Sequence, residues 1–480
     1  MSLGHQIARN AGAMALAQVV TLVSGLATTA YLARTLGPSE YGVLRFGLAM
    51  LVYATVLVRL GFQTLGTREL ARDSSRRAAL VSHILSIRLV LFVVALSVYL
   101  GCVALLPKPI EFKMAVGVLG GALLGHALSL DWVYQGLQRM GYVVLQQVAG
   151  AIVVLLGVIL LVGGPEDLVV AAWVTAMGLL AGPVALVVVY WRQFGPVNLA
   201  FDRAAWIALL RPALPLAASA FMIALYYNMD QIMLGLLRTD AEVGLYAAGY
   251  RLVTAALAPA MVVYTAFLPT LSSAVGDRGL MRARARLHGR VQLAMGLPIC
   301  VGGTMLAGPL IVLIGGPEYV AGTVALRILM VNMGVVYLNM MFGQPLPAWD
   351  LQKRHMYAIS VGAVANIILN LVLIPRFGIV GAAVATLASE VAVLIGLATL
   401  HYRAVSTLHV DLLLRPLLAT TLGVALPCYL GLVADFPLLL TFALVFVAYA
   451  LTVWVTRTVT LKDLQAIRRK PAEVATDTAE

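Results

Sequence analysis

Apolar runs recur along the whole chain, each about 20 residues long, and short polar stretches separate them. A helix needs roughly 20 apolar residues to cross the hydrocarbon core of a bilayer. We therefore predict an all-α polytopic membrane protein with about fourteen transmembrane helices. The spans lie near residues 11–34, 42–63, 84–106, 114–134, 142–163, 168–191, 212–237, 244–269, 291–314, 323–348, 357–375, 378–400, 412–432 and 436–456.

The composition agrees with lipid as the main solvent. Only 11% of the 480 residues are charged and mean hydropathy is +0.95, whereas about 25% of the residues in a soluble chain carry charge. Cys102, Cys300 and Cys428 lie in apolar runs without the spacing of metal ligands, and an odd count argues against a disulfide framework. We expect no nucleic-acid partner, because the net charge of +12 comes from short loops between spans.

Lysine and arginine are distributed unequally between the two sets of loops. The loops on the side of the amino terminus and the carboxyl-terminal tail hold 23 of them, and the opposite loops hold 5. Cytoplasmic loops of membrane proteins carry the excess of positive charge. The sequence therefore predicts a multi-pass protein of the inner or plasma membrane with both termini in the cytoplasm.

A repeat divides the chain into two halves. Residues 36–42, LGPSEYG, correspond to residues 238–244, RTDAEVG, at a shift of 202, which pairs Gly42 with Gly244. Six spans separate the two copies, so the halves run in the same direction across the membrane, as in transporters with two like lobes around a central cavity. The predicted organisation is an N-lobe at 1–191, an amphipathic cytoplasmic connector at 192–211, a C-lobe at 212–400, two further helices within 401–456, and a cytoplasmic tail at 457–480.

Ionisable groups inside predicted spans are candidates for function, because they are costly in lipid. Five arginines lie there: Arg45, Arg59, Arg88, Arg251 and Arg327. The embedded acids are fewer, namely Asp131, Asp230 and Glu390. The excess of embedded arginines over embedded acids favours an anionic substrate. Arg88 and Arg327 lie near span ends, so extension of their side chains to the membrane interface is an alternative.

A second set of polar residues lies at one depth on the seventh, eleventh and twelfth spans. Asp230, Asn366, Asn370 and Thr386 are about 8–14 Å below the periplasmic surface at 1.5 Å per residue. A carboxylate, two amide oxygens and a hydroxyl suit a small hard cation. Hydrogen bonding between helices explains the same residues without a ligand, and the spacing does not separate the two interpretations.

Four stretches together resemble the polysaccharide transporter family, which includes the flippases of O-antigen and capsule repeat units, within the multidrug/oligosaccharidyl-lipid/polysaccharide exporter superfamily. They are YLARTLGPSEYG at 31–42, DWVYQGLQRMGY at 131–142, PLAASAFMIALYYNMDQIMLG at 215–235 and NIILNLVLIPRFGIVGAAVATLASE at 366–390. The resemblance implies a two-lobed flippase that moves a polyprenyl-diphosphate-linked oligosaccharide from the cytoplasmic to the periplasmic leaflet by alternating access.

The resemblance also assigns roles to residues. Related lipid II flippases have cavity arginines on helices 2 and 8, which correspond to Arg59 and Arg251 and would bind the diphosphate. Their sodium site corresponds to Asp230, Asn366, Asn370, Thr386 and the Ala382 carbonyl. The second of the two ligand positions on the eleventh helix is an acid in those relatives and is Asn370 here. The site would then hold one negative charge rather than two, so the coupling ion is either sodium or a proton.

Two other functions fit parts of the sequence. A multidrug or cation exporter of the same superfamily would use buried carboxylates in the first lobe, where only Asp131 is available. A membrane glycan polymerase or ligase would need a long periplasmic loop with catalytic groups, and the periplasmic loops here are short. We therefore expect a transporter rather than an enzyme, active as a monomer, with no cofactor beyond the coupling ion. Expected partners are membrane lipid, the glycan polymerase and the glycosyltransferases.

Overall fold

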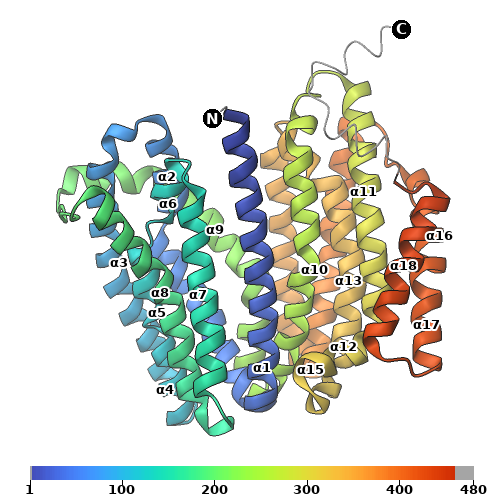
Figure 1. The fold of residues 1–480 in the computed structure, drawn as a ribbon, viewed down its shortest axis with the longest axis horizontal. Helices are drawn as coiled ribbons and strands as arrows, with labels where there is room; N and C mark the ends of the chain where they lie inside the picture. The colour runs from blue at the N-terminus through green and yellow to red at the C-terminus, as the bar shows by residue number, and fades with distance from the viewer. Residues whose placement is uncertain (1–2, 460–480) are drawn as a thin grey trace. The chain divides into compact units, whose positions relative to one another are not determined.

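The computed structural model describes residues 3–459, and these form helices and connecting turns with no strand. They fall into two compact units. Unit 1 comprises residues 1–248 with 314–318, and unit 2 comprises residues 249–313 with 319–480. Within each unit the long helices run side by side (Figure 1). The all-α fold predicted from the apolar runs is confirmed.

Unit 1 contains nine α-helices and the start of a tenth, with two short 3-10 turns. Their bounds are α1 (Leu3–Arg59), α2 (Phe62–Arg72), η1 (Ser74–Arg76), α3 (Arg77–Leu105), α4 (Ile110–Leu119), α5 (Ala122–Leu128), α6 (Asp131–Gly136), α7 (Met140–Leu161), η2 (Pro165–Asp167), α8 (Leu168–Phe194), α9 (Arg203–Leu237) and α10 (Asp240–Ser272), which continues into unit 2.

Unit 2 holds the remaining helices, apart from the end of α12 and the start of η3 at 314–318, and α11, α13, α15 and α18 are the long ones. Their bounds are α11 (Arg278–Met305), α12 (Ala307–Gly315), η3 (Pro317–Gly322), α13 (Thr323–Gly343), α14 (Pro345–Ala348), α15 (Gln352–Val405), η4 (Val410–Leu412), α16 (Leu414–Thr420), the π-helical turn η5 (Thr421–Ala425), α17 (Leu426–Val433) and α18 (Leu438–Thr456).

Eleven helical stretches in the described residues are long and apolar enough to cross a membrane, and a bent pair, α11 with α12, makes a twelfth. Two of the eleven are too long for one crossing. Helix α1 has 57 residues and α15 has 54, which at 1.5 Å per residue exceeds twice the thickness of the hydrocarbon core. Each contains one non-helical glycine, Gly37 with φ 73° and Gly378 with φ 54°, so each is two spans joined at a kink. The fourteen predicted spans are therefore all present.

Contacts within α15 show that its two halves fold back on each other. A Cβ at Gly362 would lie 2.1 Å from Val393, and one at Gly381 would lie 2.3 Å from the Leu373 carbonyl oxygen. These pairs straddle Gly378 in antiparallel order, so the hairpin brings the eleventh and twelfth spans together.

The ninth span is bent rather than straight. Helices α11 and α12 meet at an angle of 76° beside Leu306. Pro309 explains the break, because it has no N–H to donate to the Met305 carbonyl and its ring clashes with that oxygen.

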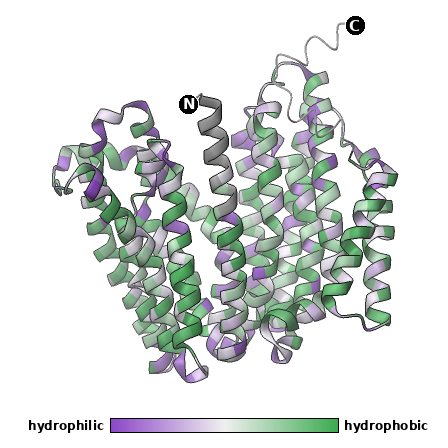
Figure 2. Ribbon diagram, in the orientation of Figure 1, coloured by the Kyte–Doolittle hydropathy of each residue, from purple (hydrophilic) through white to green (hydrophobic). Residues whose placement is uncertain are grey.

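The outer surface of the helices is apolar. Figure 2 shows hydrophobic residues over most of the length of the long helices and hydrophilic residues concentrated near their ends. In α18, Leu439, Phe446 and Trp454 are 82%, 77% and 76% exposed. Such a surface is stable only against lipid, so the protein is a multi-pass membrane protein.

The repeat predicted from the sequence produces a reciprocal contact inside unit 1. A Cβ at Gly42 would lie 1.8 Å from the Asp240 carbonyl oxygen, and a Cβ at Gly244 would lie 2.0 Å from that of Pro38. Pro38 and Asp240 differ by the same shift of 202 as the two glycines. Equivalent residues of the two copies thus contact each other in the manner of a two-fold axis.

The boundary between the two compact units, near residue 248, does not follow the sequence repeat. The lobe boundaries at 1–191 and 212–400 therefore stay predictions. In the connector, residues 195–202 are not helical, and α9 then runs without interruption from Arg203 into the seventh span. Asp202 caps this helix by accepting hydrogen bonds from the Ala204 and Ala205 amides. Of the predicted tail, residues 460–480 lie outside the described residues.

Candidate functional site

A buried polar cluster lies in unit 1 where two helical spans are interrupted at the same level. The first interruption follows Arg59, where Leu60 and Gly61 have positive φ angles of 39° and 74°. The second is Ser129–Leu130, between α5 and α6. Glycine adopts the left-handed conformation without steric cost. The turn at Gly61 starts α2 in a new direction and presents Gln63 to Asp131.

Asp131 is the acid at the centre of this cluster, and its two oxygens accept from neutral donors. Gln63 Nε2 donates to Oδ2 at 2.6 Å, and Ser129 Oγ donates to Oδ1 at 2.7 Å. Gln146 Nε2 in turn donates to Ser129 Oγ at 3.2 Å. The carboxylate is therefore held by α2 and by the break between α5 and α6, to which α7 is bonded through Gln146, and Asp131 is only 8% exposed.

Arg59 and Arg88 supply the positive charge of the cluster. Both attract Asp131 electrostatically, but neither forms a direct ion pair with it within the described part of the chain. Arg88 is 1% exposed, and its Nη1 donates to the Ser129 carbonyl oxygen at 2.8 Å. Its Nε and Nη2, and Nε of Arg59, are buried without a hydrogen-bond partner among the described residues.

The cluster therefore carries two guanidinium groups and one carboxylate, with several N–H groups unused. Buried polar groups in proteins are nearly always paired, so each unpaired group requires an explanation. Guanidinium binds phosphate and carboxylate oxygens through paired hydrogen bonds. The chemistry of the cluster suits an anion, and binding of an anion by these arginines stays a prediction.

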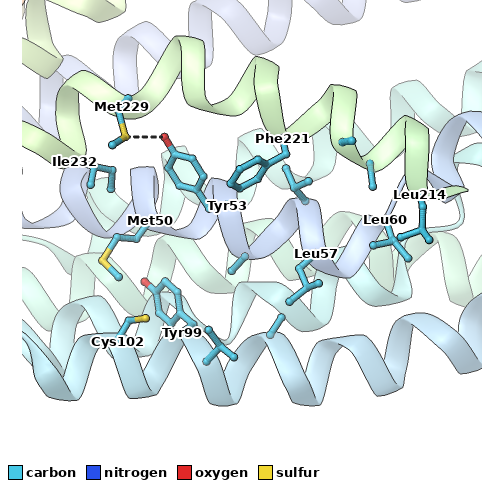
Figure 3. Close-up of a pocket in the computed structure, with 16 residues that line it drawn as sticks. Met50, Tyr53, Leu57, Leu60, Tyr99, Cys102, Leu214, Phe221, Met229 and Ile232 are labelled. Atoms are coloured by element: carbon cyan, nitrogen blue, oxygen red, sulfur yellow. Dashed lines mark hydrogen bonds between the residues drawn. The ribbon is translucent and has the colours of Figure 1, made fainter. Parts of the chain in front are cut away.

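An apolar cavity of about 700 Å³ lies between α1, α3 and α9 in the same unit. Figure 3 shows Tyr53 and Leu57 of α1, Tyr99 and Cys102 of α3, and Phe221 of α9 around it. Its complete lining is Met50, Tyr53, Ala54, Val56, Leu57, Leu60, Ala95, Val98, Tyr99, Cys102, Leu214, Ala217, Ala218, Phe221, Met229 and Ile232. This cavity cannot be predicted from the sequence, because apolar residues that line a cavity and apolar residues that face lipid have the same pattern.

The predicted cation ligands of the eleventh and twelfth spans lie together in unit 2. Asn370 Nδ2 donates to Asn366 Oδ1 at 2.9 Å, and Asn366 Nδ2 donates to Ser389 Oγ at 3.3 Å. Thr386 Oγ1 donates to the Ala382 carbonyl oxygen at 3.0 Å. The hairpin of α15 thus brings together oxygen atoms of the kinds that coordinate a hard monovalent cation. The same hydrogen bonds also stabilise the packing of the two halves of α15 against each other.

Asp230, the predicted acidic ligand, belongs to unit 1. It is 6% exposed, and Tyr246 Oη donates to its Oδ2 at 2.8 Å. Neutral hydrogen bonding of this kind lowers the cost of a buried carboxylate. The cation site as a whole stays a prediction.

The other predicted arginines differ in exposure. Arg45 on α1 and Arg251 on α10 are half-buried, whereas Arg327 is exposed near the start of α13. Arg45 lies four turns before Arg59 on the same helix. Exposure of Arg327 is compatible with an interface role as well as with substrate binding.

Two groups of residues were missed. Gln63, Ser129 and Gln146 organise Asp131 but are uncharged, so embedded charge gave no sign of them. Asn339 Nδ2 donates to Glu390 Oε2 at 2.5 Å and to the Glu390 backbone oxygen at 3.1 Å. Glu390 is recognisable in the sequence as an embedded acid, but its partner on α13 is distant in the chain.

One similar protein matches this chain over most of its length, and another matches about a third of it. A protein of Escherichia coli K12 named "Putative O-antigen transporter" is 23% identical over 80% of this chain and 93% of its own. A protein of Haloferax volcanii named "Probable flippase AglR" is 32% identical over 34% of this chain and 35% of its own.

Solved structures share the fold. The structure titled "Lipid II flippase MurJ, inward closed conformation" has a TM-score of 0.69 at 12% identity, over 91% of this chain and 97% of its own. An inward-facing multidrug resistance MATE family transporter of the MOP superfamily has a TM-score of 0.67 at 14% identity, over 81% and 95%. The family described as "Polysaccharide biosynthesis protein" matches residues 7–275, more than half of the sequence. The chain therefore belongs to the polysaccharide biosynthesis protein family.

Proposed function

We propose that the protein is a flippase that carries a polyprenyl-diphosphate-linked oligosaccharide from the cytoplasmic to the periplasmic leaflet by alternating access. The observation that carries this proposal is the cluster of Arg59, Arg88 and Asp131, which keeps an excess positive charge and unused guanidinium N–H groups within the membrane. A diphosphate offers the oxygens that such groups bind. The named O-antigen transporter and flippase relatives support the same substrate class.

The cluster also gives its residues different tasks. Arg59 is half-buried at the end of α1 and is the group that we assign to the diphosphate, together with Arg251. Arg88 is enclosed and bonded to Ser129, so it supports the site by charge and by holding the α5–α6 break in place. Direct contact between Arg88 and a substrate requires unit 1 to open.

The fold does not separate a glycan flippase from a drug exporter, because structures of both kinds share it. The net positive charge of the polar cluster favours the glycan flippase over the drug exporter. A cationic drug would be repelled by the excess guanidinium charge around Asp131, whose carboxylate is already hydrogen-bonded. The relatives are named as transporters and flippases rather than as polymerases or ligases, which supports transport without a chemical step.

We further propose that transport is coupled to a monovalent cation. Asp230, Asn366, Asn370, Thr386 and the Ala382 carbonyl would hold it, and their oxygens suit sodium. Bound cation would offset the charge of the buried Asp230 carboxylate. The proposed location is the inner membrane with both termini in the cytoplasm, since the basic loops lie on that side.

The transport assay follows lipid-linked repeat units on the cytoplasmic leaflet of cells that depend on this protein. Arg59→Ala and Arg251→Ala should each slow their removal roughly ten- to a hundredfold, because a hydrogen bond to a charged group contributes about 1.5–3 kcal/mol. Lysine at either position should recover part of the rate, since ammonium retains the charge but lacks the planar fork. Arg376→Ala, in an exposed position outside the site, is the control. Normal export by the Arg59→Ala/Arg251→Ala double variant would exclude the diphosphate role.

A further inference from the structure

Apart from the free thiol of Cys102, the apolar cavity between α1, α3 and α9 offers a ligand almost no polar group. Its lining contains two hydroxyls, and the protein uses both. Tyr99 Oη donates to the Val116 carbonyl oxygen at 2.8 Å, and Tyr53 Oη lies 3.4 Å from the Ala224 carbonyl oxygen and 3.8 Å from Met229 Sδ. Figure 3 shows the Tyr53 hydroxyl directed at Met229. A sugar or phosphate placed here would lose its hydration without compensation, so the cavity suits hydrocarbon.

The cavity is elongated along the helices. On α9 its lining extends from Leu214 to Ile232, about 27 Å at 1.5 Å per residue, and on α1 it extends from Met50 to Leu60, about 15 Å. The longer wall is close to the full thickness of the hydrocarbon core, about 30 Å. A chain-like molecule aligned with the lipid tails fits this shape better than a compact one.

The cavity is open along one side. Val98, Leu214 and Phe221 line it and are also 56%, 54% and 41% exposed. Val94, one turn from Val98 on α3, is 48% exposed. The opening thus continues into an exposed apolar surface, and this continuity gives a lateral route between the cavity and the surrounding lipid.

A positive charge lies at one end of the cavity. Arg211 is exposed and precedes Leu214 by three residues, so the two side chains share a face of α9. On the predicted topology this is the cytoplasmic end. An anionic head group attached to the chain would meet Arg211 there, as expected for a lipid loaded from the cytoplasmic leaflet.

We propose that this cavity binds the polyprenyl chain of the lipid-linked substrate, with the phosphate end of that lipid at the cytoplasmic end of the cavity, where Arg211 lies and where Arg59 directly precedes the lining residue Leu60. The inference rests on the proposed function for the identity of the lipid. The lining is rich in aromatic and sulfur-containing side chains, including Tyr53, Phe221, Met50 and Met229. Flexible thioethers fill irregular gaps and flat aromatic faces bury large apolar areas, so together they pack well against a branched, unsaturated chain.

Photo-crosslinking tests occupancy in full-length protein in nanodiscs. A benzophenone amino acid replaces Phe221, which lines the cavity, or Ile223, which is 59% exposed but outside the lining. With added undecaprenyl diphosphate, position 221 should give the prenyl adduct at a yield about tenfold above that of position 223, as expected if the burial of two or more methylene groups favours the cavity. Equal yields at the two positions, or a phospholipid adduct at 221 that undecaprenyl diphosphate does not displace, would overturn the proposal.

A matched pair of variants tests the role of the cavity in transport. Ala218 lines it and is exposed, whereas the adjacent Ser219 is exposed but does not line it. Ala218→Trp should reduce export of a substrate with a C55 chain about tenfold while a C10 analogue is exported normally, because only the long chain fills the cavity. Ser219→Trp should leave both unchanged. Equal loss on both chain lengths would mean that Ala218→Trp acts through the fold and that the cavity has no part in chain binding.

The two proposals fail differently. If wild-type protein exports neither substrate but the 221 adduct forms, the cavity binds prenyl lipid and the flippase function is wrong. If export is normal and no 221 adduct forms, the function stands and the prenyl chain lies elsewhere.

Discussion

Arg88 shows how a charged side chain is tolerated in the interior of unit 1. Its side chain is 1% exposed, and the Asp131 carboxylate attracts both it and Arg59 electrostatically. An isolated cation at this depth would be strongly destabilising, and a nearby carboxylate held by Gln63 and Ser129 reduces that cost. The balance of two arginines against one aspartate thus affects the stability of the folded protein as well as the proposed binding of substrate.

Asp131→Asn should therefore destabilise unit 1, because two guanidinium groups lose their common counter-charge. Since no direct ion pair is broken, we expect a loss of about 1–3 kcal/mol, the cost of leaving buried polar groups without their partner. Thermal unfolding of the purified protein in detergent measures it. Arg88→Met in the Asp131→Asn background should recover part of the loss, and Asp435→Asn, at an exposed position, should have little effect. An unchanged melting temperature for Asp131→Asn would show that the arginines do not depend on this acid.

Asp230 allows a test of the coupling ion at the scale of one residue. Sodium that binds the folded protein stabilises it with a concentration dependence set by its affinity. Melting temperature should rise with sodium and less with potassium, and Asp230→Asn should abolish the rise. If the site carries a proton instead, the melting temperature should change with pH and ignore sodium. A response to neither ion, with normal export by Asp230→Asn, would leave Asn366, Asn370 and Thr386 as packing residues.

Helix packing in unit 1 depends on the absence of side chains at the two repeat-related glycines. A Cβ at Gly244 would lie 2.0 Å from the Pro38 carbonyl oxygen and 3.1 Å from the Gly42 amide nitrogen. Both neighbours are backbone atoms, so relief would require the spans themselves to separate. The contact therefore fixes how closely the starts of the second and eighth spans approach.

Gly244→Ala should accordingly destabilise the protein by about 1–3 kcal/mol, the usual cost of overpacking. Gly141→Ala is the matched control, because it lies in α7 with nothing within 4 Å of its Cβ position. There alanine should stabilise the helix by up to about 1 kcal/mol, through its better helix propensity. Thermal melts of the two variants should shift in opposite directions. Equal shifts would mean that the contact at Gly244 relaxes freely.

At the scale of the whole molecule, the span count sets the topology. Two double-length helices, α1 and α15, each cross twice, and fourteen crossings return the chain to the side on which it began. Reporter fusions at Glu166, between the fifth and sixth spans, should report the periplasm, and fusions at Glu480 should report the cytoplasm. Residue 480 lies outside the described residues, so its side follows from the span count alone. A periplasmic signal at Glu480 would require an odd number of crossings.

The sequence by itself determined the fold class, the number of spans and the embedded charges. Lipid imposes this outcome, because a chain with 11% charged residues must satisfy its backbone within helices of membrane length. The repeat was also visible, since the tight contact of Gly42 and Gly244 restricts both positions to glycine.

Only the tertiary structure decided which polar residues meet and where space is left. Gln63 reaches Asp131 because the backbone turns at Gly61, and Asn339 reaches Glu390 because α13 packs on α15. The cavity between α1, α3 and α9 arises from how three helices pack, and its residues are as apolar as their lipid-facing neighbours. Hydrophobicity specifies that a residue leaves water. It does not specify whether protein, lipid or a bound chain then covers that residue, because all three provide the same apolar surroundings.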